Sequence, residues 1–225
     1  MRAALTILAK DLRIEWRTKE SVTTVAVLAV LLLVVFSFAH DPTPEVAPTL
    51  APAVLWTTFV FTGLLGVQRA FLLEREQDCL SGLLGAPIDP GAIYLGKLAG
   101  TVVLLGVMQA VLVPLVAIML RADVLPVLPA LLLVLALGNL GFAALSTLFA
   151  ALAVRTRARE VLLPLLLLPL LAPLVIAAVS ATRGVLHGGL AAASDALGVL
   201  IAFDVIFPDP QGAEEQLQTL IERLR

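Results

Sequence analysis

The chain has 225 residues, of which 60% are hydrophobic and 14% charged, and its formal net charge is −2. Its mean hydropathy is +1.03. A soluble domain carries about 25% charged residues, so this chain has too few charges to cover a water-facing surface. The absence of a basic excess argues against nucleic acid as a partner. A single cysteine, Cys79, excludes an internal disulfide and a cysteine metal cluster. The composition is that of an integral membrane protein.

The apolar segments predict an all-α, polytopic bundle of six transmembrane helices, because about 20 apolar residues in a helix cross the hydrocarbon of a bilayer. We expect these helices at residues 22–39, 51–67, 98–120, 125–153, 161–182 and 194–207. Pro48 and Pro52 suggest that the second helix begins near Ala51. The sixth is weaker, because the apolar stretch between Asp195 and Asp204 is too short to cross alone. Either the segment 184–194 contributes to it or the sixth helix is truncated.

The distribution of Lys and Arg orients the bundle with the N-terminus in the cytosol. On this arrangement 13 of the 15 basic residues are on the inner side, and only Arg121 and Arg183 are on the outer side. Positive residues are retained on the cytosolic side, so the pattern predicts a multi-pass protein of the cytoplasmic (inner) membrane. Arg223 and Arg225 count as inner only if the sixth segment truly crosses.

Both ends of the chain carry amphipathic segments. In residues 1–21, Leu5, Leu8, Leu12 and Trp16 share one helical face, which predicts an interfacial helix lying along the membrane. The alternative is a charged leader that only sets the topology. Residues 208–225 form a C-terminal amphipathic tail, in which a narrow apolar stripe runs along a charged helix.

The longest inner segment, residues 68–97, is the candidate docking element for a cytosolic partner. Its leucines form a broad helical stripe, while Glu74 and Asp78 lie on the opposite side with Arg75 and Glu76 on the flanks. The other interpretation is a solvated loop helix that contacts nothing. Pro90 suits the first position of the helix that follows.

A second inner segment, between the fourth and fifth spans, carries three alternating arginines. Arg155, Arg157 and Arg159 are candidates for the same docking role. Arginines at a membrane exit also serve as ordinary topology anchors that bind anionic head groups, so lipid is an alternative partner.

The sequence contains no convincing catalytic, metal or cofactor site. Residues 91–98, GAIYLGKL, resemble a phosphate-binding loop but lack the final hydroxyl and the preceding strand that such a loop needs. Neither a zinc-protease motif nor a nucleophile elbow is present. His40 and His187 each stand alone on the outer side, and we do not expect them to ligate haem iron.

Two features of the spans predict how the helices pack. Gly138-Asn139-x-Gly141 favours close approach of a neighbouring helix, with Asn139 bonding to it. Pro164, Pro169 and Pro173 predict a kinked helix in the fifth span.

Several separate motifs resemble the permease B subunit of the cytochrome c maturation system, the haem exporter protein B family. They are residues 10–20 (KDLRIEWRTKE), 55–56 (LW), 69–76 (RAFLLERE), 82–87 (GLLGAP), 92–97 (AIYLGK) and 155–164 (RTRAREVLLP). Together they extend the resemblance over about residues 3–207. The C-terminal end departs from the family pattern, because members continue apolar through a long sixth span where this chain has Pro208-Asp-Pro.

The resemblance implies an ABC-2 exporter-like permease without enzymatic activity, which binds no cofactor directly. It implies a separate cytosolic ATPase subunit that binds ATP, a haem-handling membrane subunit and a small membrane subunit as partners. A second copy of the chain is a further candidate partner. The assembly would serve c-type cytochrome biogenesis, by haem export or by release of a haem-loaded periplasmic chaperone. The alternative is a permease of the same architecture for a lipid or another small hydrophobic molecule.

Overall fold

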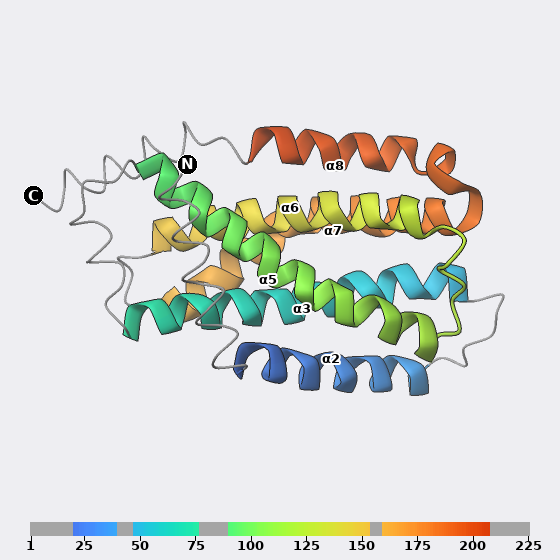
Figure 1. Ribbon diagram of the computed structural model, residues 1–225, viewed down its shortest axis with the longest axis horizontal. Coiled ribbons are helices and arrows are strands. Elements are labelled where there is room, and N and C mark those ends of the chain that lie inside the picture. The colour runs from blue at the N-terminus through green and yellow to red at the C-terminus, as the bar shows by residue number, and fades with distance from the viewer. Residues whose placement is uncertain (1–19, 40–46, 77–89, 154–158, 208–225) are drawn as a thin grey trace, which may run out of the picture.

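The computed structural model describes residues 20–39, 47–76, 90–153 and 159–207, and these residues form helices joined by turns, without strands. The predicted interfacial helix, apart from its last two residues, and the C-terminal tail lie outside this range. Six helices follow one another: α2 Glu20–Ala39, α3 Ala47–Glu76, α5 Pro90–Met119, α6 Leu128–Ala153, α7 Arg159–Ala192 and α8 Ser194–Ile206. They run alternately up and down along the long axis of the molecule, as Figure 1 shows, with α5 crossing the bundle obliquely. The all-α prediction is therefore confirmed for the described residues.

Four of these helices contain stretches long and apolar enough to cross a membrane. The stretches are Thr49–Gln68, Tyr94–Met119, Leu128–Phe149 and Leu165–Ala192. Within the described residues α2 adds a shorter apolar stretch, Ala26–Ala39. Helix α8 has 13 residues and is about 20 Å long, which is less than the roughly 30 Å of a hydrocarbon core.

The perimeter of the bundle is apolar. Side chains that are more than half exposed include Val27, Phe38, Ile118, Leu132, Leu165, Ile176 and Val205. A soluble monomer rarely exposes contiguous apolar surface on this scale. Lipid is the solvent that suits this surface, so the exposed side chains support the same conclusion as the composition.

Helix α3 differs most from its predicted bounds. It begins at Ala47 and continues through Pro52. Pro52 is tolerated because the hydrogen bond that it cannot donate would reach only the carbonyl of Pro48, close to the helix start. At the other end, α3 continues nine residues beyond the predicted limit at 67 and ends at Glu76. Residues 68–76 (QRAFLLERE) contain no glycine or proline, so nothing in them stops the helix.

The predicted coupling loop 68–97 is consequently much shorter in the structure. Its first part belongs to α3 and its last part to α5, which begins at Pro90 as expected for proline at a first helical position. The prediction of a separate short helix inside this loop is wrong for residues 68–76. Helix α6 begins three residues later than predicted, after a turn in which Arg121 has φ 53 and the N–H of Ala122 reaches the carbonyl of Ala117. That bond closes α5 with a Schellman-type cap.

Helix α7 begins two residues earlier and ends ten residues later than predicted, and it is interrupted near its end. Its backbone leaves helical geometry at Gly188 and Gly189, and the φ of Gly189 is 73, a value that favours glycine. A Cβ on Gly184 would lie 2.6 Å from the carbonyl oxygen of Ala192, so only glycine lets the chain fold back there. Residues 184–193 therefore end α7 and turn the chain, and α8 begins only at Ser194.

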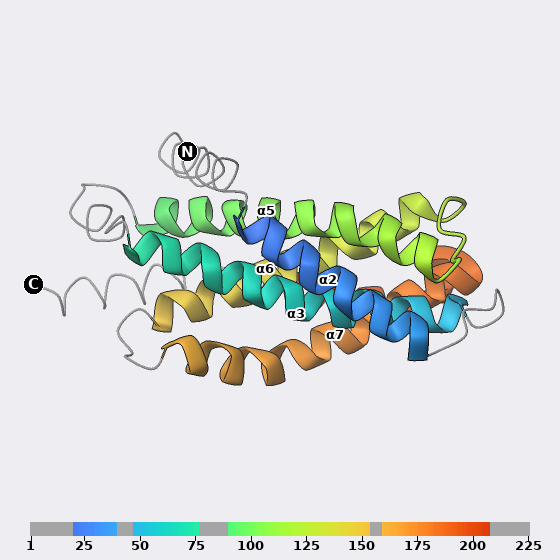
Figure 2. The same ribbon diagram turned by 90° about the horizontal axis from the view of Figure 1, so that it is seen from below.

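Prolines also shape α7. Pro164, Pro169 and Pro173 remain inside the helix, and the backbone of the described residues keeps helical dihedral angles there. Figure 2 shows α7 as a curved helix, and its break at Gly188 and Gly189 lies well beyond the prolines. Each proline removes one backbone hydrogen bond, which allows this curvature.

Candidate functional site

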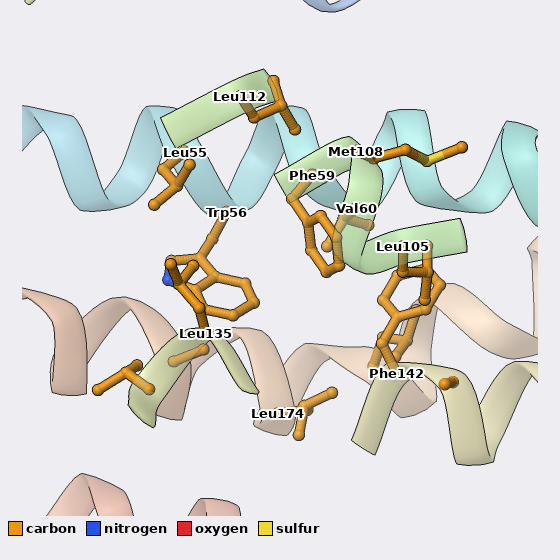
Figure 3. Packing of buried hydrophobic residues seen from close by; sticks show 14 of the residues in the cluster. Leu55, Trp56, Phe59, Val60, Leu105, Met108, Leu112, Leu135, Phe142 and Leu174 are labelled. Carbon is orange, nitrogen blue, oxygen red and sulfur yellow. The ribbon is translucent and has the colours of Figure 1, made fainter. Parts of the chain in front are cut away.

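The buried core joins α3, α5, α6 and α7 around an aromatic cluster. Trp56 and Phe59 of α3 and Phe142 of α6 are each 1% exposed, and their rings meet edge to face with centroids 5.4 Å apart in each successive pair. Figure 3 shows these rings between Leu105, Met108 and Leu112 on one side and Leu135 and Leu174 on the other. Edge-to-face aromatic pairs add to the packing free energy beyond the area that they bury.

Glycines of α6 create the space for this cluster. A Cβ on Gly138 would lie 2.7 Å from Cζ3 of Trp56 and closer still to Cη2. A Cβ on Gly141 would lie 2.7 Å from Cδ1 of Leu174. The predicted role of these two glycines in close helix packing is therefore confirmed.

Polar side chains link the helices inside the apolar bundle. The Nε1 of Trp56 donates to Oγ1 of Thr182 at 2.8 Å, which joins α3 to α7. The Nδ2 of Asn139 donates to the carbonyl of Val102 and to Oε1 of Gln109, both at 3.2 Å. The predicted bond from Asn139 to a neighbouring helix is thus confirmed, and its partner helix is α5.

Gln109 completes this link in the opposite direction. Its Nε2 donates to the carbonyl of Leu135 at 3.3 Å, so α5 and α6 exchange hydrogen bonds through two amide side chains. Sequence reasoning missed both Gln109 and the Trp56–Thr182 pair. A lone amide in an apolar span is the signal that could have found Gln109, because such a group needs a partner in lipid.

The residues that resemble a phosphate-binding loop cannot act as one. Residues 91–98 lie within the first turns of α5, so their amides are part of a helix rather than a loop. The side chain of Lys97 is only 9% exposed, and its carbonyl accepts a hydrogen bond from Oγ1 of Thr101 at 3.0 Å. Thr147 of α6 in turn lies 3.5 Å from Thr101, oxygen to oxygen, so this region is helix packing.

The residues predicted to dock a cytosolic partner map to one end of the bundle. Glu74, Arg75 and Glu76 form the last turn of α3, and Arg159 is the first residue of α7. Figure 1 shows that these two helix ends, together with the start of α5, lie at the same end of the molecule. Asp78, Arg155 and Arg157 lie outside the described residues.

The opposite end of the bundle carries His187. His187 is exposed near the end of α7, one residue before the break at Gly188, whereas His40 lies outside the described residues. Among the described residues no group of three or more His, Cys, Asp or Glu side chains could hold a metal ion.

Comparison with known proteins places the chain in a family. The family model described as "CcmB protein" matches residues 2–207. The chain belongs to the CcmB family. Three relatives carry the name "Heme exporter protein B". The protein of Pseudomonas aeruginosa is 28% identical over 182 residues, which is 81% of each chain.

The other two relatives match to a similar extent. That of Rhodobacter capsulatus is 29% identical over 76% of this chain and 78% of its own length. That of Paracoccus denitrificans is 29% identical over 79% of this chain and 81% of its own. The CcmB match ends at Phe207, the residue after α8, so the tail 208–225 lies beyond it.

Proposed function

We propose that this CcmB chain is the permease subunit of an ABC-type complex of c-type cytochrome maturation. It would couple ATP hydrolysis by a separate subunit to haem export or to release of a haem-loaded periplasmic chaperone. The observation that carries this proposal is the match to the CcmB family over nearly all of the described bundle, together with relatives named heme exporter protein B. Four helices of the described part of the chain are long and apolar enough to cross a membrane, which supports the permease role.

The structure supports a separate source of ATP-derived work. The segment that resembles a phosphate-binding loop is helical, and its lysine is buried. A permease of this kind must receive mechanical work through a contact at one end of the bundle. The end that carries Glu74, Glu76 and Arg159 is the candidate, because the charge distribution of the sequence assigns it to the cytosol.

Helix α3 provides a direct path from that end into the core. It is continuous from Ala47 to Glu76. Glu76 and Trp56 therefore belong to one rigid element and lie about 30 Å apart along its axis. Trp56 is fixed to Thr182 of α7 by its hydrogen bond and to Phe59 by ring packing. A displacement of the last turn of α3 would therefore move the α3–α7 contact without passing through a flexible loop.

We place the ATPase-docking surface on Glu74, Arg75, Glu76 and Asp78, with Arg155, Arg157 and Arg159 beside them. A haem-handling membrane subunit, a small membrane subunit and a second copy of the chain are the other proposed partners. The inner membrane, with a cytosolic N-terminus, is the proposed location. A permease for a lipid or small hydrophobic molecule remains the alternative function, because the fold alone suits either cargo.

Complementation distinguishes the two functions. The chain and its own partner subunits would be expressed in a bacterium whose haem exporter B gene is deleted, and covalent haem in c-type cytochromes would be measured by peroxidase staining. We expect staining to return with the chain and to be absent when the chain alone is omitted. A stably inserted chain that copurifies with an ATPase and yet restores no cytochrome c would favour the lipid permease.

A further inference from the structure

The short helix α8 carries a half-buried aspartate whose carboxyl group is turned toward the bundle. Asp204 lies three residues before the end of the described chain, and α8 packs against α6 and α7. Both carboxyl oxygens of Asp204 are buried, and neither has a hydrogen-bond partner among the described residues. Asp204 shares a helical face with Leu200, the buried residue of α8 one turn before it, whereas Val199 and Ile206 on the other side are exposed, so the carboxyl group faces the bundle.

The carboxyl group of Asp204 packs beside Gly141, a glycine near the middle of α6. A Cβ on Gly141 would lie 3.1 Å from Oδ1 of Asp204 and 2.7 Å from Cδ1 of Leu174. Gly141 is close to the midpoint of α6, which runs from Leu128 to Ala153. The carboxyl group therefore lies beside the middle of α6, between a glycine and a leucine, and the stretch Leu128–Phe149 of this helix is long enough to cross a membrane.

Neither neighbouring helix offers it an opposite charge. Helix α6 contains no titratable residue. On α7 the nearest basic residue to Leu174 is Arg183, nine residues away and therefore about 14 Å along the axis, followed by His187. Arg159 is fifteen residues away in the other direction, about 22 Å. The remaining acid of α8, Asp195, lies in its exposed first turn.

An ionised carboxylate there would have neither solvent nor a counter-charge among the described residues, and this is costly in a membrane interior. A metal ion is disfavoured, because no cluster of three or more ligands exists among the described residues. A proton is the ligand that needs no second protein group, since it neutralises the carboxylate by itself.

We propose that Asp204 is an intramembrane proton-binding site, and that its bound proton holds α8 against Gly141 of α6 and Leu174 of α7. The neutral acid fills the space that the glycine leaves. Loss of the proton creates a buried charge at that contact, which drives α8 away from α6. The turn at Gly188 and Gly189, with its non-helical backbone, is the hinge about which α8 moves. This role is independent of the cargo that the protein transports.

Infrared spectroscopy on the purified chain tests the site directly. The protein would be held at neutral pH in a maltoside detergent, which contributes no carbonyl band. We expect a protonated-carboxyl C=O band in the wild type and in the control Asp195→Asn, and its loss in Asp204→Asn. Asparagine is nearly isosteric with the neutral acid. If the asparagine variant does not fold, the spectrum of Asp204→Ser is compared with that of the wild type instead.

Thermal unfolding against pH tests the link to α8. The unfolded chain exposes Asp204 to water, where it ionises readily, so the bound proton stabilises the fold at low pH and its contribution is lost as pH rises. The unfolding temperature of the wild type and of Asp195→Asn should therefore fall with pH relative to that of Asp204→Asn. A wild type without the band would instead indicate an ionised carboxylate paired with a cation and would overturn the proposal. A pH dependence that Asp204→Asn shares with the wild type would overturn it equally.

Discussion

Replacing Gly138 with alanine should destabilise the bundle, although alanine is the better helix former. A Cβ at this position would lie 2.7 Å from Cζ3 of Trp56, against about 3.5–4.0 Å for an ordinary carbon–carbon contact. The indole cannot turn aside freely, because it is 1% exposed and its Nε1 donates to Thr182 at 2.8 Å. Either α6 must move away from α3 or this hydrogen bond must break.

The loss of unfolding free energy in Gly138→Ala can be estimated from these two outcomes. Overpacking of a tight core costs about 1–3 kcal/mol. A hydrogen bond between membrane helices is worth about 0.6 kcal/mol on average and up to roughly 1.7. The better helix propensity of alanine returns at most about 1 kcal/mol. We therefore expect Gly138→Ala to lose about 1–3 kcal/mol of unfolding free energy.

The assay is reversible unfolding in mixed micelles by titration with SDS, and Gly106→Ala is the matched control. Gly106 also lies within a long helix, but its added Cβ would meet only Nδ2 of Asn139, at 3.4 Å. That variant should be neutral or slightly more stable. In a Trp56→Leu background the cost of Gly138→Ala should shrink, because the contacting ring is absent. Equal stability of Gly138→Ala and Gly106→Ala would refute the packing argument.

Three further predictions concern the polar links, the histidines and the topology. Asn139→Leu should lose about 1–3 kcal/mol in the same SDS assay, because it removes two hydrogen bonds to α5 and leaves Gln109 Oε1 unpaired; stability equal to the wild type would contradict this. The double variant His40→Ala, His187→Ala should still assemble c-type cytochromes by peroxidase staining, and complete loss from a stably inserted protein would show that a histidine is required. In a Cys79→Ser background, a membrane-impermeant thiol reagent added outside should label Glu45→Cys and spare Arg157→Cys; efficient labelling at 157 would reverse the assigned orientation.

Some of the architecture could be predicted from the sequence because its cause is local. Apolar runs predict helices in a membrane, and the glycines of α6 predict close packing because only glycine leaves room for the ring of Trp56. Asn139 was also predictable as an interhelical donor, because an amide in an apolar span needs a hydrogen-bond partner.

Other features depend on contacts that no local pattern reveals. The span predicted at 51–67 agrees with the apolar stretch Thr49–Gln68, but the continuation of the same helix to Glu76 was not predicted, because hydropathy falls at Gln68 while helix propensity continues. The pairing of Trp56 with Thr182 joins residues 126 positions apart, so no spacing rule could find it. Asp204 appeared only as the end of a short apolar stretch, because its burial is created by Gly141 and Leu174 of other helices.

The central claim is that a separate ATPase works on the end of the bundle where α3 ends and α7 begins. The most direct measurement is copurification of the ATPase subunit with the triple variant Glu74→Lys, Glu76→Lys, Asp78→Lys. Three changes are needed because one charge at the rim of an interface contributes little, whereas a close pair can be worth about 2–5 kcal/mol. Added lysines on the cytosolic side agree with the orientation rule, so insertion should be normal.

Asp123→Lys, an exposed acidic residue at the other end of the bundle, is the control for charge reversal itself. We expect the triple variant to insert, to lose the ATPase on gentle purification and to assemble no c-type cytochrome, while Asp123→Lys retains both. A triple variant that keeps the ATPase and full cytochrome assembly would show that residues 74–78 only connect α3 to the next segment, and would contradict the proposed docking surface.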